Sequence, residues 1–394
     1  MSSVSTGETT KASRPRTQTA SGWRQGLSKS SGPGLILGMT LLDLARLLKE
    51  NGLDFPARSW LKLAATGLIS LVTTPLRRVE DAVYCRRLAR QEVQNPLFII
   101  GHWRSGTTHL HNLMSIDERF AYANFSQMMI PHTFLVGERV ISTLSALLLP
   151  PERMGVDNVA MHPHVPWEDE FALSQMTGMS PYMTWVFPRR ADHYDRYVTF
   201  RDAPTAEVER WKAAFVKLLK KLAWKHQRPL ILKSPPHTGR IKMILEMFPD
   251  ARFVHIHRDP YVVYQSTMRL HQKCIENYSL QSCHEAMLHG RVIRQYREML
   301  DAFFEERHLI PPGQFCEVSF AELEADPLGL VRRIYDQLAL PNFDDVETAL
   351  TRYIDSLAGY EKNSHVPLTA DVRAEIVREW RRSFEEWKYP THGR

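Results

Sequence analysis

Residues 97–114 read LFIIGHWRSGTTHLHNLM, and this stretch decides the fold that the rest of the chain must follow. Its first four residues form a short apolar run of the kind that makes a buried strand. A glycine, Gly101, opens a loop, and Thr108 begins a segment with the apolar spacing of a helix. A strand that leads through a tight loop into a helix directs backbone N–H groups and the positive end of the helix dipole toward one point. The stretch therefore predicts an anion-binding site at the end of a buried strand.

The loop nearly matches the spacing of the nucleotide-binding P-loop, with Gly101 and Gly106 followed by two threonines. A P-loop carries lysine at position 107, where this chain has threonine, and the cation here is Arg104, inside the loop. Several neighbouring residues can donate hydrogen bonds to an anion, namely Arg104, Ser105, Gly106, Thr107 and Thr108. We interpret the loop as a cradle for a phosphate or sulfate group that is not part of an ordinary NTPase. Taken alone, it is also explained as a glycine-containing turn followed by a threonine N-cap.

The bulk composition allows one large α/β domain with additions, or two domains. The chain has 394 residues, of which 43% are hydrophobic, and 50 Lys and Arg against 44 Asp and Glu give a net charge of +6. This mild basic excess suits an anionic small molecule, a membrane surface or nucleic acid. Nucleic acid is the least favoured partner, because no zinc-finger, homeodomain or RRM signature is present. The four cysteines lie far apart without CxxC spacing, so we expect no metal site, no disulfides and a cytoplasmic location.

Composition divides the chain into three parts. Residues 1–34 are rich in Ser, Thr and Gly with scattered Lys and Arg, which is typical of a disordered basic tail. Residues 35–95 contain two apolar runs, at 35–48 and 60–76, and we expect an N-terminal helical segment there. Residues 96–394 are expected to form the main domain.

The two apolar runs of the N-terminal segment are too short or too charged for a confident membrane span. The second run ends at Arg77 and Arg78, as in helices that lie in a membrane interface. Two interpretations stay open. Either the segment is a helical hairpin packed on the main domain, or residues 35–76 make peripheral contact with the inner face of the membrane.

From residue 97 onward, short apolar runs alternate with longer amphipathic segments. The runs that we interpret as buried strands are 97–100, 230–232, 253–256 and 315–318. The amphipathic segments, interpreted as helices, are 108–115, 207–225, 238–247, 261–269, 283–306 and 328–338. This alternation predicts βαβ units, and hence a parallel sheet with helices on both faces. Because ligands of such sheets bind beyond the carboxyl ends of the strands, the loops after the strands should hold the site.

The loop after the strand at 230–232 reads KSPPH, residues 233–237, and two prolines stiffen it. Its lysine, Lys233, can stabilise a leaving-group anion, and its histidine, His237, can take up a proton near neutral pH. In isolation, the same two residues are also explained as surface charge and a helix cap.

The loop after the strand at 253–256 carries Arg258, and Ser266 follows eight residues later. That spacing places the serine about two turns into the next helix. An arginine beside a hydroxyl on a helix makes a second anion site, suited to a phosphate monoester.

An acidic cluster, Glu168, Asp169 and Glu170, interrupts this otherwise basic chain. Acidic residues at a helix N-terminus are ordinary capping chemistry. They are also candidates to orient an acceptor or to accept its proton. The apolar side chains near the cluster have two interpretations as well, an acceptor pocket or plain core. They are Met128, Met129, Phe134, Trp185 and Phe187.

Together, the two anion sites closely resemble those of the sulfotransferase family, whose sulfuryl donor is 3′-phosphoadenosine-5′-phosphosulfate (PAPS). The Arg-Ser-Gly-Thr-Thr run at 104–108 is similar to the 5′-phosphosulfate loop of the bacterial-type branch. Arg258 and Ser266 are similar to the family's 3′-phosphate site. Residues 360–365 resemble the same branch, and the resemblance implies that Lys362 and Asn363 close over the cofactor.

The resemblance implies a sulfotransferase fold, that is, a P-loop-like parallel sheet flanked by helices, here with an N-terminal helical extension. It implies transfer of a sulfuryl group from PAPS to a hydroxyl or amine, without a metal ion, because protein cations take its place. The apolar residues near the acidic cluster favour a lipid or another hydrophobic alcohol as the acceptor. Arg104 and Lys233 are then expected to stabilise the charge that grows on the leaving oxygen.

The general base departs from the family pattern. Cytosolic relatives place a catalytic histidine two residues after the lysine, and that position is Pro235 here. His237 is therefore the first candidate for the base, with Glu168 and Glu170 behind it.

Two rival functions stay open on the sequence alone. A P-loop-type kinase or NTPase would need lysine where Thr107 stands. A membrane-surface adaptor that uses the basic tail and residues 35–76 would leave the three charged loops unexplained.

Overall fold

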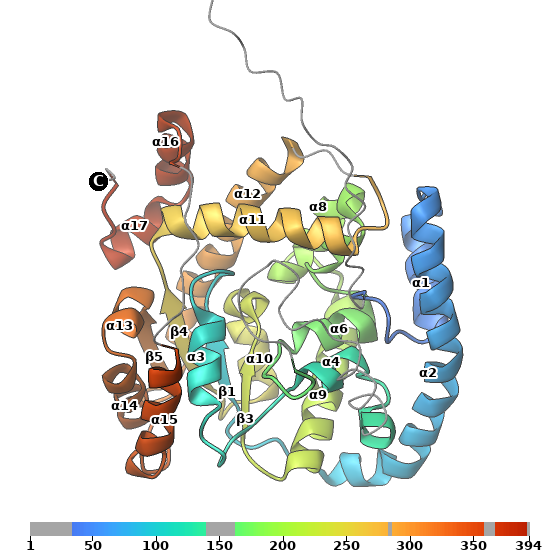
Figure 1. Cartoon of the computed structure of the whole chain (residues 1–394), viewed down its shortest axis with the longest axis horizontal. Coiled ribbons are helices and arrows are strands. Elements are labelled where there is room, and N and C mark those ends of the chain that lie inside the picture. Colours follow the sequence, from blue (N-terminus) through green and yellow to red (C-terminus); the bar gives the residue numbers. More distant parts are fainter. Residues whose placement is uncertain (1–33, 139–161, 283–285, 358–366, 392–394) are drawn as a thin grey trace, which may run out of the picture.

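A five-stranded parallel sheet stands at the centre of the computed structural model, which describes residues 34–138, 162–282, 286–357 and 367–391 (Figure 1). Its strands are β1 (Leu97–Ile100), β2 (Ala121–Tyr122), β3 (Leu230–Lys233), β4 (Arg252–His257) and β5 (Phe315–Ser319). The order across the sheet is β2-β3-β1-β4-β5, and every pairing is parallel. All four predicted strands are present, and β2, which has two residues, was not predicted.

Helices lie on both faces of the sheet, as the alternating pattern predicts. They are α1 (Leu41–Asn51), α2 (Ala57–Arg90), α3 (Thr107–Met114), α4 (Phe125–Met129), α6 (Glu170–Thr177), α7 (Met183–Val186), α8 (Ala191–Asp195), α9 (Thr205–His226), α10 (Ile241–Met247), α11 (Pro260–Tyr278), α12 (Ala286–Glu306), α13 (Phe320–Ala325), α14 (Pro327–Gln337), α15 (Asp344–Ser356), α16 (Ala370–Glu379) and α17 (Arg381–Trp387). The predicted α/β class is confirmed.

The central strand β1 supplies side chains to two separate cores, because successive residues of a strand point to opposite faces. Phe98 and Ile100 join the larger core, to which α6, α9 and α12 contribute. Leu97 and Ile99 join the smaller core, which α3, α14 and α15 cover. All four residues of β1 are fully buried, so the strand holds the loop that follows it in a fixed place.

The predicted helix at 238–247 is shorter in the structure. The two prolines of the loop after β3 begin a 3₁₀ turn, Pro235–Gly239, and α10 begins only at Ile241. Between them Arg240 leaves the helical region, with φ −135° and ψ 24°.

The N-terminal segment contains two helices that pack on each other, as the hairpin interpretation predicts. Helix α1 also contacts α6, and α2 contacts α9, so both are attached to the main domain (Figure 1). None of the helices in the described ranges combines the length and the apolar character that crossing a bilayer requires. The division at residues 34 and 95 stays a prediction, and residues 1–33 of the predicted tail lie outside the described residues.

Candidate active site

The loop between β1 and α3 curls over the carboxyl end of the central strand. Gly101 and Gly106 have φ angles of 148° and 107°, and Arg104, between them, has φ 69°. A Cβ atom on Gly106 would lie 2.3 Å from the ring of Phe320, so only glycine fits there. A non-glycine residue held in the left-handed region is strained, and such strain clusters at ligand-binding sites.

The same loop contains hydrogen-bond donors that are not satisfied within the described residues. Ser105 is buried, and its Oγ has no hydrogen-bond partner in the described part of the chain. Thr107 is the first residue of α3, where backbone N–H groups have no acceptor within the helix. A buried hydroxyl without a partner beside free amide groups is the donor set that a phosphate or sulfate group satisfies.

The first and third predicted loops meet through their arginines. Arg104 Nε donates to Ser266 Oγ at 2.8 Å, and Arg258 Nη1 donates to the backbone oxygen of Arg104 at 3.3 Å. The Arg258 guanidinium lies 4.0 Å from the centre of the Phe320 ring, which fixes its plane. The two predicted anion sites are therefore adjacent in space.

The carboxyl end of β3 brings the second loop to the first. Lys233 Nζ lies 3.2 Å from Thr108 Oγ1 and 2.5 Å from Glu168 Oε1. The hydroxyl of Tyr182 donates to the other carboxylate oxygen of Glu168 and accepts a hydrogen bond from Trp103 Nε1 at 3.3 Å. Burial, followed by the charge of Glu168, raises the pKa of Tyr182 well above its usual value, so the phenol stays a donor. Glu168 is thus oriented from both sides at the edge of the first loop.

His237 lies in the core and not at the surface of its loop. Its side chain is fully buried, and its Nε2 lies 2.5 Å from Oδ2 of Asp169, which is buried too. The imidazole packs among aromatic rings, with Phe98 at 5.7 Å and Phe215 at 5.1 Å between centroids. This position argues against the predicted role of His237 as the base, because an acceptor hydroxyl would have to enter the core to reach it.

Glu170, the third candidate base, is also part of the core. It forms a two-pronged ion pair with Arg240, at 2.7 and 3.1 Å, and both side chains have no exposed area. Its backbone N–H donates to Ser234 Oγ at 3.0 Å, and that hydroxyl donates to Asp169. Of the three consecutive acidic residues, only Glu168 remains partly exposed, at 16% of its side chain.

The apolar residues that were candidates for an acceptor pocket belong to the larger core. The side chains of Met128, Met129, Phe134, Trp185 and Phe187 are at most 8% exposed.

The sequence analysis did not identify two residues of the site, Tyr182 and Trp103. Tyr182 bonds Glu168 directly, and Trp103 bonds Tyr182. Of the two, only Trp103 lies within the first loop, where its position in the sequence could have marked it as a site residue. Lys362 and Asn363 lie outside the described residues.

Comparison with known proteins identifies the family of the chain. The sulfotransferase family profile matches residues 96–345. The chain therefore belongs to the sulfotransferase family, and its predicted enzyme class is confirmed.

Similar relatives extend over nearly the whole chain. The omega-hydroxy-beta-dihydromenaquinone-9 sulfotransferases Stf3 of Mycobacterium tuberculosis and Mycobacterium bovis are each 33% identical over 359 residues, covering 91% of this chain and 92% of theirs. Among solved structures, sulfotransferase STF9 from Mycobacterium avium has a TM-score of 0.64 at 19% identity and covers 91% of this chain and 98% of its own. Sulfotransferase STF1 from Mycobacterium tuberculosis H37Rv has a TM-score of 0.61 at 20% identity, over 87% and 100%. These two structures confirm the fold.

Proposed function

We propose that this sulfotransferase uses PAPS as its donor and sulfates the hydroxyl of a hydrophobic alcohol. One observation carries the choice of donor, the 2.8 Å contact between Arg104 Nε and Ser266 Oγ. It makes the two anion sites contiguous, so a single ligand with two separate anionic groups can span them. The bacterial-type loop at 104–108 holds the 5′-phosphosulfate, and Arg258 with Ser266 holds the 3′-phosphate.

The transfer is an in-line displacement, close in logic to phosphoryl transfer. The acceptor oxygen forms a bond to sulfur, the bond from sulfur to the 5′-phosphate oxygen breaks, and adenosine 3′,5′-bisphosphate leaves. Negative charge grows on that leaving oxygen, and Arg104, Lys233 and the loop N–H groups are the donors that stabilise it. These side chains supply the positive charge that Mg²⁺ supplies in a P-loop enzyme, so transfer without a metal ion remains our prediction.

Glu168 is our choice for the general base. It is the one member of the acidic cluster that lies at the edge of the first loop, 2.5 Å from Lys233. When the lysine ammonium turns toward the leaving oxygen of the donor, Oε1 of Glu168 becomes available to the acceptor hydroxyl. Tyr182 keeps its hydrogen bond to the other carboxylate oxygen and so holds the group in orientation.

The donor assignment predicts nucleotide binding without magnesium. In the presence of EDTA, calorimetry should show that adenosine 3′,5′-bisphosphate binds more tightly than ATP. Arg258→Ala should weaken the bisphosphate by about tenfold to a hundredfold, because a charged hydrogen bond is lost. ATP, which has no 3′-phosphate, should bind the variant as it binds the wild type.

A matched control is Arg381→Ala, which removes an arginine side chain that is 77% exposed. It should change neither affinity. Tighter binding of ATP than of the bisphosphate, and only with Mg²⁺, would favour the rival P-loop kinase or NTPase.

Two observations support the proposed acceptor class, namely the names of the relatives and the surroundings of Glu168. The Stf3 proteins are named for omega-hydroxy-beta-dihydromenaquinone-9, and the chain is 33% identical to them over nearly its full length. Aromatic rings stand beside Glu168, since Phe171 packs on Trp167 at 5.5 Å and on Tyr182 at 5.2 Å. Such surroundings suit an apolar acceptor with one hydroxyl.

Incubation with ³⁵S-labelled PAPS tests this class directly. With a detergent-dispersed lipid extract as the acceptor, we expect labelled product in the organic phase. With a polar glycan extract, we expect no labelled glycan in the aqueous phase. Label confined to the glycan fraction would contradict the lipid assignment and leave the donor assignment intact.

A further inference from the structure

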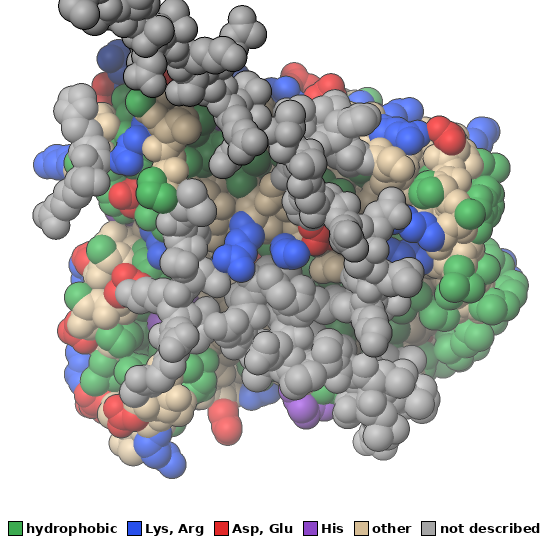
Figure 2. Space-filling model, turned by 45° about the horizontal axis from the view of Figure 1, so that its top comes forward, with side chains coloured by type: hydrophobic (Ala, Val, Ile, Leu, Met, Phe, Trp, Pro, Cys, Tyr) green, Lys and Arg blue, Asp and Glu red, His purple; other side chains and the backbone are tan. Residues whose placement is uncertain are grey.

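Helix α2 is oriented with its polar side toward the protein and its apolar side toward solvent. Its buried residues are mostly polar, namely Ser59, Thr66, Ser70, Thr73 and Glu80, together with Leu63 and Leu88. Its outer face consists of Trp60, Leu61, Leu68, Leu71, Val72 and Val79, which are 48%, 77%, 67%, 56%, 59% and 51% exposed. A surface helix of a globular protein normally shows the opposite arrangement. Figure 2 shows hydrophobic side chains gathered along the right-hand edge of the molecule, where α1 and α2 lie.

Buried polar contacts hold α2 in this orientation. Near its start, Ser59 Oγ donates to the backbone oxygen of Leu280 at 3.0 Å. Near its middle, Glu80 pairs with Lys221 of α9 at 2.5 Å, and the two side chains are only 2% and 1% exposed. Rotating the helix to bury its outer face would break this pair and leave a buried charge without a partner, which is strongly unfavourable.

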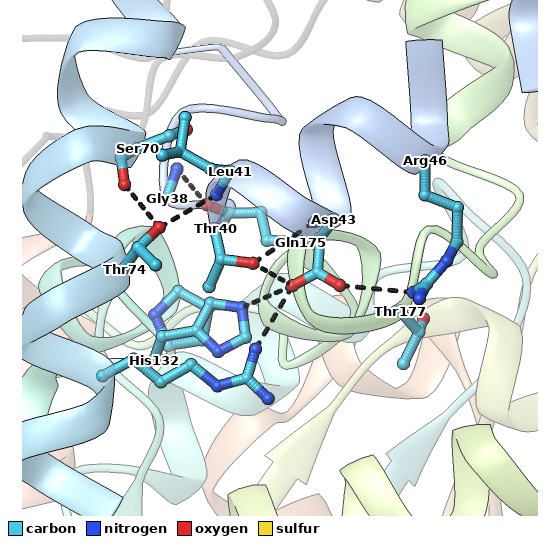
Figure 3. A network of polar contacts seen from close by, with 12 residues as sticks. Gly38, Thr40, Leu41, Asp43, Arg46, Ser70, Thr74, His132, Gln175 and Thr177 are labelled. Atoms are coloured by element: carbon cyan, nitrogen blue, oxygen red, sulfur yellow. Dashed lines mark hydrogen bonds and ion pairs between the residues drawn. The ribbon is translucent and has the colours of Figure 1, made fainter. Parts of the chain in front are cut away.

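A second set of contacts ties α2 to α1 (Figure 3). Asp43 of α1 lies at the centre, and Thr40, Arg46 and His132 point toward its carboxylate. In the same view Thr74 of α2 accepts a hydrogen bond from the backbone N–H of Leu41 at 3.0 Å. Several polar groups of α2 are thus bonded toward the domain, and on its outer face only Trp60 has a ring contact in the described part of the chain, with Phe55 at 5.9 Å between centroids.

The charges on the exposed side of α2 are mostly positive. Five arginines of this helix are exposed, namely Arg58, Arg78, Arg86, Arg87 and Arg90. Asp81, whose side chain is 41% exposed, is paired with Lys217 of α9 at 2.6 Å. Anionic lipid headgroups complement an apolar face flanked by arginines. A second copy of the chain complements it poorly, because a two-fold interface through this face would bring two arginine-rich surfaces together.

We propose that the outer face of α2 docks on an anionic lipid bilayer. The helix lies parallel to the membrane, its leucines and valines enter the boundary between headgroups and acyl chains, and its arginines contact the headgroups. This inference rests on α2 alone and does not require the acceptor to be a lipid. If the acceptor is a lipid, docking also brings the enzyme to the membrane in which that acceptor is dissolved.

Vesicle flotation of the full chain tests the proposal. Vesicles of phosphatidylcholine mixed with phosphatidylglycerol should carry the wild-type protein upward, and vesicles of phosphatidylcholine alone should carry much less. The triple variant Leu61→Gln, Leu68→Gln, Val72→Gln should lose at least about tenfold in binding to the anionic vesicles. Leu309→Gln, which alters a leucine 43% exposed and away from α2, is the control and should bind like the wild type.

Two further measurements check that the triple variant is folded and distinguish a bilayer from a second copy of the chain as the partner of this face. Affinity for adenosine 3′,5′-bisphosphate should be the same in the triple variant, which shows that the domain is folded. Flotation of the triple variant equal to that of the wild type would overturn the proposal. So would sedimentation that finds a wild-type dimer converted to monomer by the three substitutions, without any vesicle binding by the wild type.

Discussion

Replacing Glu168 with glutamine is expected to lower the rate of the chemical step by about 10²–10⁴-fold, the usual contribution of a general base. Glutamine has nearly the same shape and can still accept from Tyr182, but it cannot take the acceptor's proton. The Glu168 side chain is 16% exposed and is paired with Lys233, whose side chain is 1% exposed, so binding of adenosine 3′,5′-bisphosphate by the variant serves as the check that it is folded. Single-turnover transfer from labelled PAPS measures the step without interference from product release.

The control for this variant is Glu118→Gln. Glu118 is an exposed glutamate shortly after α3. Its variant should react at the wild-type rate. A full-rate chemical step in Glu168→Gln, with unchanged binding of adenosine 3′,5′-bisphosphate, would exclude Glu168 as the base.

The fold was largely predictable because parallel strands buried on both faces appear as continuous apolar runs. The runs at 97–100 and 315–318 lie within one residue of the observed strands. β2 was missed because two residues at a sheet edge form no pattern. The position of β1 between β3 and β4 could not be read from the sequence either, since it depends on pairing across 130 and more residues, such as Ile99 with Lys233.

The convergence of the site was predictable, and the division of roles within it was not. Loops after neighbouring parallel strands must meet at one edge of the sheet, so Arg104, Lys233 and Arg258 were expected to lie close together. Three consecutive acidic residues have the same chemistry, however, and the start of a helix turns each about 100° from the last. Only tertiary packing determines that Glu168 faces the first loop while its two neighbours enter the core.

Helix α2 illustrates the same limit. A helical period shows that polar and apolar residues occupy different faces, but it does not show which face the protein covers. The hairpin and membrane interpretations of residues 35–76 appeared as alternatives for this reason. In the structure the helix packs on the domain through its polar face, so the two interpretations are compatible.

His237→Ala is expected to destabilise the protein by about 3–5 kcal/mol, because it leaves the buried carboxylate of Asp169 without its ionic partner. The two side chains lie 2.5 Å apart with no exposed area, so bulk solvent does not screen the carboxylate. Urea unfolding, followed by tryptophan fluorescence, measures the loss. If His237 were instead the base that acts on the acceptor, the variant would transfer sulfate more slowly, and its free energy of unfolding would be nearly unchanged.

The pH dependence of this loss identifies its cause. Burial alone would raise the pKa of Asp169, but the charge and hydrogen bond of His237, with the Ser234 hydroxyl, hold it below its usual value. In the wild type, this contribution to stability is present above the ordinary pKa of an aspartate and is lost as pH falls through the lowered pKa. In His237→Ala burial dominates, so folding takes up a proton and becomes more favourable as pH falls. The difference in unfolding free energy should therefore shrink toward acid pH, whereas an unchanged stability with a slow chemical step would return the role of base to His237.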